Sequence, residues 1–127
     1  MGTAVRLHRR IPVITNHPEA DQNVLMVVDV PERSRLEIRV GDETAGFVEY
    51  RRAPGRIAFI HTSIDPRFDG RGLGSELVRA ALADARAEGL AVLPFCPFVR
   101  SYIEAHPEYL DLVPEDMRAR FALPAHG

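Results

Sequence analysis

Three glycines at alternate positions, Gly70, Gly72 and Gly74, separate an apolar, strand-like run from a strongly helical one. Because glycine has no side chain, its backbone can approach a ligand closely. The first turn of a helix also has N–H groups without intrahelical partners, and these groups bind phosphate. The spacing therefore predicts a phosphate-bearing ligand at this loop, although the same glycines could serve only as turn and capping residues.

Two familiar glycine-rich loops do not fit this stretch. A P-loop is excluded because no Gly-Lys-Ser or Gly-Lys-Thr follows the glycines. A dinucleotide-binding fingerprint opens the crossover of a parallel βαβ unit and has an acidic residue on the next strand. Here the pattern before the loop predicts an antiparallel meander, and the next strand, Leu90 to Phe95, has no acidic residue. The phosphate ligand has to be identified from the rest of the sequence.

Two further side chains could carry out chemistry. Cys96 follows the apolar run that ends at Phe95, and an isolated buried cysteine is usually a small hydrophobic residue. As the only cysteine it excludes an internal disulfide and a multi-cysteine zinc site. His61 is the only histidine in the apolar run 56–64, where it could be a general base or a satisfied core histidine. The His, Asp and Glu residues lack metal-site spacing, so we expect no metal.

The elements before the loop are expected to be β-strands. From Arg35 to Val40 apolar residues alternate with charged ones, which is the period of a half-buried strand. The turn residues predict two more strands, at 44–50 and 56–64, with Phe47 as the apolar anchor of the first and 52–55 as the turn between them. Consecutive strands joined by short turns form an antiparallel meander.

The loop is followed by helical and apolar segments. Leu73, Leu77, Ala81 and Ala85 fall on one face, which predicts an amphipathic helix. That helix is expected at Ser75–Glu88, ended by Gly89. It is followed by a strand at 90–95, which its apolar residues predict to be buried on both faces. A helix at 98–105, ended by His106-Pro107, and a helical turn near 115–121 complete the predicted elements. The fold class is therefore α+β, with an antiparallel meander followed by strand, loop, helix, strand and helix, and with the helices packed on the sheet.

The size and composition fit one compact domain, since the chain has 127 residues of which 46% are hydrophobic. We expect residues 32–127 to form this domain. Residues 1–31, with a strand at Val24–Val30, are expected to be an arm or extra strand, partly disordered. The net charge of −2 and the pI of about 6.2 predict no binding to nucleic acid or membrane. The absence of a long apolar run and of a signal-peptide h-region predicts a cytoplasmic protein.

Several spaced motifs resemble the GNAT superfamily of N-acetyltransferases. The central motif of that superfamily is Gln/Arg-x-x-Gly-x-Gly/Ala at a strand–helix junction, and residues 69–74 match it with Asp69 in place of Gln or Arg. The resemblance tightens to a subgroup of short, single-domain GNAT-like proteins and covers residues 32–113. The other motifs of the subgroup are here Arg35-Leu36-Glu37, His61-Thr62-Ser63-Ile64-Asp65-Pro66, Pro94-Phe95-Cys96-Pro97-Phe98-Val99 and His106-Pro107-Glu108-Tyr109.

The resemblance implies a mixed sheet of the GNAT type and acetyl-coenzyme A, or coenzyme A, as the cofactor. It implies that the strand 56–64 separates from the strand after the helix, and that pantetheine bonds to backbone groups there. The pyrophosphate would lie on the amides at the start of the helix, with Arg71 either as a charged contact or as a solvated side chain. The cofactor-binding residues are then expected to be Ser63, Ile64, Gly70, Arg71, Gly72, Leu73, Gly74 and Ser75.

The resemblance also implies three catalytic residues. Cys96 lies close to the position of the thioester in the family, where it could accept the acyl group, buffer a proton or line the site. His61 would be the general base, directly or through a water molecule. Tyr102 occupies about the place where many GNAT enzymes carry a tyrosine that protonates the leaving thiolate, although packing would explain it equally well.

The leading prediction is an N-acetyltransferase that moves an acetyl group from acetyl-coenzyme A to an unidentified small-molecule or peptide amine. One alternative is a coenzyme-A-binding module with little or no turnover. Another is an acyl-group handler that forms a thioester on Cys96. A homodimer could complete the acceptor site, because the chain is too short for the N-terminal helices that build this pocket in larger GNAT enzymes.

Overall fold

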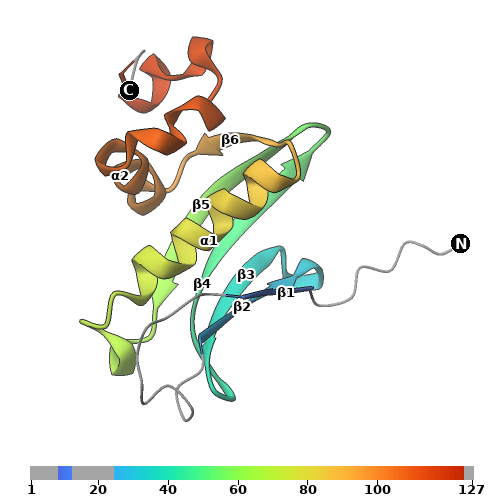
Figure 1. Ribbon diagram of the computed structural model, residues 1–127, viewed down its shortest axis with the longest axis vertical. Helices are drawn as coiled ribbons and strands as arrows, with labels where there is room; N and C mark the ends of the chain where they lie inside the picture. Colours follow the sequence, from blue (N-terminus) through green and yellow to red (C-terminus); the bar gives the residue numbers. More distant parts are fainter. Residues whose placement is uncertain (1–8, 13–24, 125–127) are drawn as a thin grey trace, which may run out of the picture.

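The computed structural model describes residues 9–12 and 25–124. Its strands are β1 (Arg9–Pro12), β2 (Leu25–Val30), β3 (Arg35–Val40), β4 (Glu43–Ala53), β5 (Arg56–Ile64) and β6 (Ala91–Pro94). Its α-helices are α1 (Leu73–Ala87) and α2 (Pro97–Ala105), and short 3-10 helices are η3 (Pro31–Arg33), η4 (Pro66–Phe68), η5 (Pro107–Leu112), η6 (Glu115–Met117) and η7 (Ala119–Phe121). Figure 1 shows α1 lying across the middle of the sheet and the C-terminal segment beyond β6.

The six strands form one sheet in chain order. Neighbouring strands are antiparallel from β1 to β5, whereas β5 and β6 pair in parallel. The antiparallel meander and the strand–helix–strand unit that follows it confirm the predicted α+β class. The sequence did not predict β1, which pairs with β2. Val24, the first residue of the strand predicted at 24–30, lies outside the described residues.

β4 is longer than the sequence predicts. The residues expected to begin a turn, Arg52 and Ala53, instead continue the strand, and the turn is confined to Pro54 and Gly55. The Arg52 guanidinium lies 5.2 Å from the centre of the Tyr50 ring and donates a hydrogen bond to Glu88 at 3.1 Å. These contacts with a ring on the same strand and with the end of α1 stabilise the extension, and local turn propensity does not encode them.

α1 buries the face that the periodicity predicts. Leu73, Leu77, Ala81 and Ala85 are all buried. The helix begins at Leu73, two residues before the predicted start, because Gly72 adopts the left-handed conformation directly before it. Gly89 has a φ of 72° after the last turn and ends the helix as predicted.

Among the described strands, β6 is an edge strand that pairs with β5 alone. The prediction of a strand buried on both faces at 90–95 is therefore wrong in part. Val92 and Pro94 are buried, but Ala91 and Leu93 are only half-buried, and Phe95 is exposed beyond the end of the strand. The chain turns at Cys96 into α2, which begins at Pro97 and ends at Ala105 before His106, as predicted within one residue.

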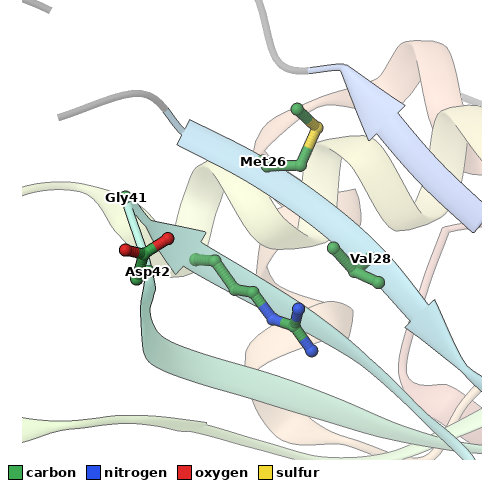
Figure 2. Close-up of a pocket in the computed structure, with 5 residues that line it drawn as sticks. Met26, Val28, Gly41 and Asp42 are labelled. Carbon is green, nitrogen blue, oxygen red and sulfur yellow. The ribbon is translucent and has the colours of Figure 1, made fainter. Parts of the chain in front are cut away.

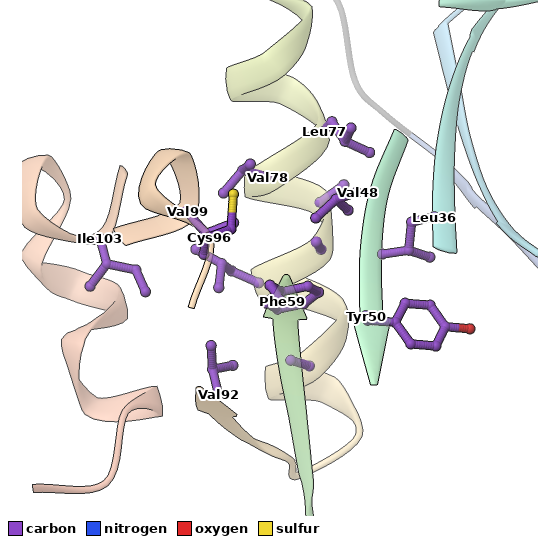
Figure 3. Packing of buried hydrophobic residues seen from close by; sticks show 14 of the residues in the cluster. Leu36, Val48, Tyr50, Phe59, Leu77, Val78, Val92, Cys96, Val99 and Ile103 are labelled. Carbon is purple, nitrogen blue, oxygen red and sulfur yellow. The ribbon is translucent and has the colours of Figure 1, made fainter. Parts of the chain in front are cut away.

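The hydrophobic core lies between the sheet and the two helices. Figure 3 shows Val48 of β4, Phe59 of β5 and Leu77 of α1 in this core, and all three are completely buried. The sequence predicted Phe47 as an anchor of β4, but this residue is only half-buried. Successive strand residues point to opposite faces, so the inward direction of Val48 turns Phe47 to the face that α1 does not cover.

The face opposite α1 carries a cluster of ion pairs. Glu37 of β3 lies between Arg35 and Arg39, each of which has a guanidinium nitrogen 2.8 Å from its carboxylate. The sequence pattern predicted an outward Glu37, but the side chain is buried beneath these two arginines. Burial acts to raise the pKa of Glu37, but the hydrogen bonds from Arg39 and Arg35 outweigh it and hold the pKa below its usual value.

A pocket of about 210 Å³ also opens over β2, β3 and the hairpin after β3 (Figure 2). Its lining residues are Met26, Val28, Arg39, Gly41 and Asp42, and none of them is a predicted site residue. Separately, no helix within residues 25–124 is both long and apolar enough to cross a membrane.

Candidate functional site

The glycine loop presents bare backbone before α1. Gly70 and Gly72 have φ values of 79° and 72°, in the left-handed region that favours glycine. A Cβ atom placed on either residue would meet no other atom within 4 Å, so both face open space. Gly72 is also the residue that precedes the first turn of α1, whose N–H groups point into the same region. The loop therefore has the shape and the donors of an anion cradle.

Two arginines flank the loop, and they differ in their partners. The guanidinium groups of Arg67 and Arg71 each lie 5.3 Å from the centre of the buried Phe68 ring. Arg67 pairs with Asp65 and Glu43, at 3.3 and 3.5 Å. Within the described part of the chain, Arg71 has no carboxylate partner. Its charge is held next to the loop and is free to meet an anion.

The parallel strands β5 and β6 separate halfway along β5. Their pairing covers Arg56–Phe59 and Ala91–Pro94, and the Cys96 N–H donates to the Phe59 carbonyl at 2.8 Å just beyond it. A β-bulge lies at the same level, since Tyr50 pairs with Phe59 but Glu49 pairs with His61. β5 then continues to Ile64 while the other chain turns into α2. Ser63 and Ile64 thus lie on the part of β5 beyond its pairing with β6.

Gly46 on β4 fixes the end of β5. A Cβ atom on Gly46 would lie 2.5 Å from the Ser63 carbonyl oxygen and would collide with the Ile64 side chain. The Asp65 N–H also donates to the Ala45 carbonyl at 2.7 Å. Only a glycine lets the chain pass this closely, so Gly46 is a positioning residue for β5. Sequence reasoning treated it as an ordinary strand residue, and only the cross-strand register reveals its role.

Cys96 is buried where the two strands part. Its side chain is 2% exposed and belongs to the core cluster that also contains Val78 and Val99 (Figure 3). The Cys96 sulfur lies 3.2 Å from the Thr62 hydroxyl, in hydrogen-bond contact. The structure therefore joins Cys96 to β5 through Thr62, a residue that the sequence did not single out.

His61 lies on the face opposite α1. It is exposed, and its ring meets that of Phe47 edge-on with centroids 6.2 Å apart. The alternative of a satisfied core histidine is therefore wrong. Because Thr62 contacts buried Cys96 and the preceding strand residue points to the other face, the sheet separates the His61 and Cys96 side chains.

Tyr102 packs within α2 and the segment after it. Its ring stacks on His106 with centroids 4.0 Å apart and leans on Tyr109 at 6.0 Å. Burial raises the pKa of Tyr102, so its phenol is protonated at neutral pH. No hydrogen bond joins any two of Cys96, His61 and Tyr102 in the described structure.

Phe98, at the start of α2, is a neighbour of the glycine loop that the sequence analysis did not identify. A Cβ atom on Gly74 would lie 2.8 Å from the Phe98 ring, so the ring rests directly on the first turn of α1. The ring is nevertheless 44% exposed. The only sequence signal was a phenylalanine on a short helix, and the pattern gave no reason to bring it to the glycine loop.

A family model described as GCN5-related N-acetyl-transferase matches residues 35–112, which is more than half of the chain. The match includes β3 to η5 and thus the glycine loop, the separated strands and α2. A comparison with curated proteins gives no match.

Proposed function

The chain belongs to the GCN5-related N-acetyltransferase family, and from that premise we propose that it binds acetyl-coenzyme A and transfers the acetyl group to an amine. The observation that carries the proposal is the open glycine loop at the start of α1. Family membership supports acetyl transfer in general, and the loop supports this particular cofactor, because a diphosphate matches its exposed amides and adjacent positive charge.

The residues of the loop fit the diphosphate. Gly70 and Gly72 would let the phosphates approach the backbone, and the amides from Leu73 to Ser75 would donate to them. Arg71, held over Phe68, would add a charge-assisted hydrogen bond. Past Phe59, the edge of β5 would donate and accept hydrogen bonds along the pantetheine arm at Ser63 and Ile64.

The bound cofactor supplies an activated acetyl group as a thioester. The protein's part is to orient the acceptor amine and to move its proton. His61 is exposed and is assigned as the group that takes the amine proton on a ring nitrogen, directly or through water. Tyr102 is assigned as the O–H donor to the leaving sulfur, which requires its side chain to leave the stack with His106. Cys96 lines the point where the strands part.

Titration calorimetry with coenzyme A tests the loop, and Gly55 provides a matched control. Gly55 and Gly72 have φ values of 76° and 72°, and both face open space, but Gly55 lies in the turn between β4 and β5. Replacement by alanine should cost each site about 1–2 kcal/mol of stability, because both become strained. Only Gly72→Ala should also weaken coenzyme A binding, by about tenfold or more. Equal affinities for the two variants would contradict the proposal.

Release of coenzyme A from acetyl-coenzyme A with a panel of amines and peptides tests the transfer itself. We expect turnover with at least one acceptor and a large loss of it in His61→Ala, with unchanged coenzyme A affinity. Tight cofactor binding without turnover across the panel would instead identify a binding module. Mass spectrometry after incubation with acetyl-coenzyme A tests for an acyl-group handler. An acetyl adduct on Cys96 in the wild-type protein, and no adduct in Cys96→Ser, would identify that function.

A further inference from the structure

A second pocket opens on the face of the sheet opposite α1, over the start of β4 and the end of β5. Its volume is about 290 Å³, and its lining includes Arg35, Phe47, Ser63 and Asp65. Phe47 and Ser63 lie directly opposite each other on the two strands. Ser63 follows His61 by two residues, so the two side chains lie on the same face about 7 Å apart along the strand. The pocket therefore adjoins the proposed base.

Arg35 brings an uncompensated positive charge to this pocket. Its Nε and Nη2 atoms lie 2.9 and 2.8 Å from Oε2 of Glu37, while Arg39 occupies Oε1 of the same carboxylate. Two guanidinium groups thus share one negative charge. Within residues 9–12 and 25–124, the Nη1 group of Arg35 makes no hydrogen bond, and the guanidinium is held 4.4 Å from the centre of the Phe47 ring. A carboxylate in the pocket would meet a charged donor that is already fixed in place.

Two acidic side chains nearby determine which way a bound amine would point. Asp65 lines the pocket, but it accepts hydrogen bonds from the backbone N–H and the Nε of Arg67, at 2.9 and 3.3 Å, which neutralise its charge. Glu49 is exposed and lies between Arg35 and His61 in the strand register, and no ion pair joins it to Arg35 in the described structure. An amine is therefore favoured beside Glu49 and His61, and an anionic group beside Arg35.

We propose that this pocket binds the acceptor, that the acceptor is a small amine carrying a carboxylate, and that Arg35 selects it. The proposal rests on the proposed function, because the thioester of the cofactor is the amine's reaction partner. The backbone hydrogen bonds of a strand lie in the plane of the sheet, so an arm bonded to the free edge of β5 leaves the face opposite α1 open to the acceptor.

The reaction and the size of the pocket agree with a small acceptor. The amine nitrogen would bond to the acetyl carbon as the carbon–sulfur bond breaks. The amine proton would pass to His61, and the electron pair would leave with the sulfur. The volume is at the lower limit of the about 300–1,000 Å³ of sites for drug-sized ligands, so the pocket suits a small molecule.

Paired probes test the selection. The ω-amino carboxylates from 3-aminopropanoate to 6-aminohexanoate vary the distance between amine and carboxylate, and the matching carboxamides remove the charge at constant length. We expect at least one carboxylate to exceed its carboxamide about tenfold in kcat/KM, as for one charge-assisted hydrogen bond. Calorimetric titration of the same probes into the coenzyme A complex should give the same preference as a ratio of Kd values, and this readout does not require turnover.

Two arginine variants show whether Arg35 is the cause. Arg35→Gln should lower the values for the carboxylates to those of the carboxamides, and Arg35→Lys should restore part of the preference. Arg39→Gln is the matched control, because Arg39 also lies 2.8 Å from Glu37 but lines the pocket over β2 and β3 instead. Both glutamine variants leave Glu37 with one arginine, and only Arg39→Gln should keep the preference.

Three results would overturn the acceptor assignment: equal values for carboxylates and carboxamides, the same loss in both glutamine variants, or a preference for an acidic peptide over every small probe. Coenzyme A binding with acetylation of any amine would then still support the proposed function. A protein that neither binds coenzyme A nor acetylates an amine would overturn both.

Discussion

At the scale of single residues, the buried hydroxyl of Tyr50 on β4 stabilises the sheet through a polar contact with β2. It donates a 2.6 Å hydrogen bond to Asp29, a carboxylate on β2 that is completely buried. Burial and this bond raise the pKa of Tyr50 to about 12. Its protonated form is therefore favoured in the folded state, so its contribution to stability is full below pH 10 and is lost as the pH rises towards 12.

Tyr50→Phe should lower the free energy of unfolding by about 1–3 kcal/mol at neutral pH, because Asp29 loses a donor in a buried position. The difference between the two proteins should disappear between pH 10 and 12. Guanidinium denaturation at several pH values measures both effects. A difference that stays constant through this range would show that Tyr50 acts through packing alone.

Glu37 holds two arginines on the face that carries His61. Arg35 reaches from Glu37 to the Phe47 ring, at 4.4 Å from its centre, and Phe47 in turn meets His61. Because the pKa of Glu37 is lowered on folding, its ion pairs stabilise the protein above about pH 4.5 and are lost as the pH falls through the folded pKa. A single carboxylate thus orders the surface around the proposed base.

Glu37→Gln should lower the free energy of unfolding by about 1–3 kcal/mol at pH 7, since it leaves two guanidinium groups without a charged acceptor. Below the folded pKa the two proteins should be equally stable. Glu49→Gln, a change of an exposed carboxylate on the neighbouring strand, is the control and should alter stability little. Chemical denaturation from pH 3 to 7 measures the difference, and equal loss in both variants would contradict this account.

At the scale of elements, the contact between Phe98 of α2 and Gly74 of α1 couples the two helices. Alanine is about 1 kcal/mol better than glycine within a helix, but here its Cβ would overlap the Phe98 ring. Gly74→Ala should therefore bring little gain in the wild-type protein. In a Phe98→Ala background the same change should stabilise by about 0.5–1 kcal/mol.

A double-mutant cycle with thermal or chemical unfolding measures this coupling. Since the ring is 44% exposed, it can move aside by rotation about its side-chain bonds, so neither single variant should fail to fold. A gain from Gly74→Ala that is the same in both backgrounds would mean that the helices do not share this contact.

At the scale of the whole molecule, the sequence predicted the elements whose periodicity is local. β3, β5 and α2 fall within one residue of their predicted bounds, and α1 within two, because alternation, helical spacing and capping residues lie within each segment. The contacts between distant segments were not predictable from the sequence. Cross-strand register or helix docking determines three such contacts: the close approach of Gly46 to Ile64, the hydrogen bond between Thr62 and Cys96, and the packing of Phe98 on Gly74.

The candidate site divides in the same way. The glycine loop was found from the sequence because its chemistry depends on backbone conformation at consecutive residues. The sequence identified the proposed catalytic side chains by their residue types, but it did not predict the face of the sheet on which each of them lies. A bulge at Ile60 and the strand separation decide that Cys96 is buried while His61 is exposed, and no local pattern encodes either feature.

Binding of the cofactor should stabilise the entire domain, since a ligand that binds only the folded state opposes unfolding of the whole cooperative unit. At a coenzyme A concentration one hundred times its Kd the gain is about 2.7 kcal/mol. For a domain of this length that corresponds to a rise in Tm of roughly 10 °C. Gly72→Ala should show a much smaller rise at the same concentration, whereas Gly55→Ala should match the wild-type increment from its own lower baseline. Differential scanning fluorimetry over a range of coenzyme A concentrations measures this, and a Tm that does not change with concentration would contradict binding at the loop.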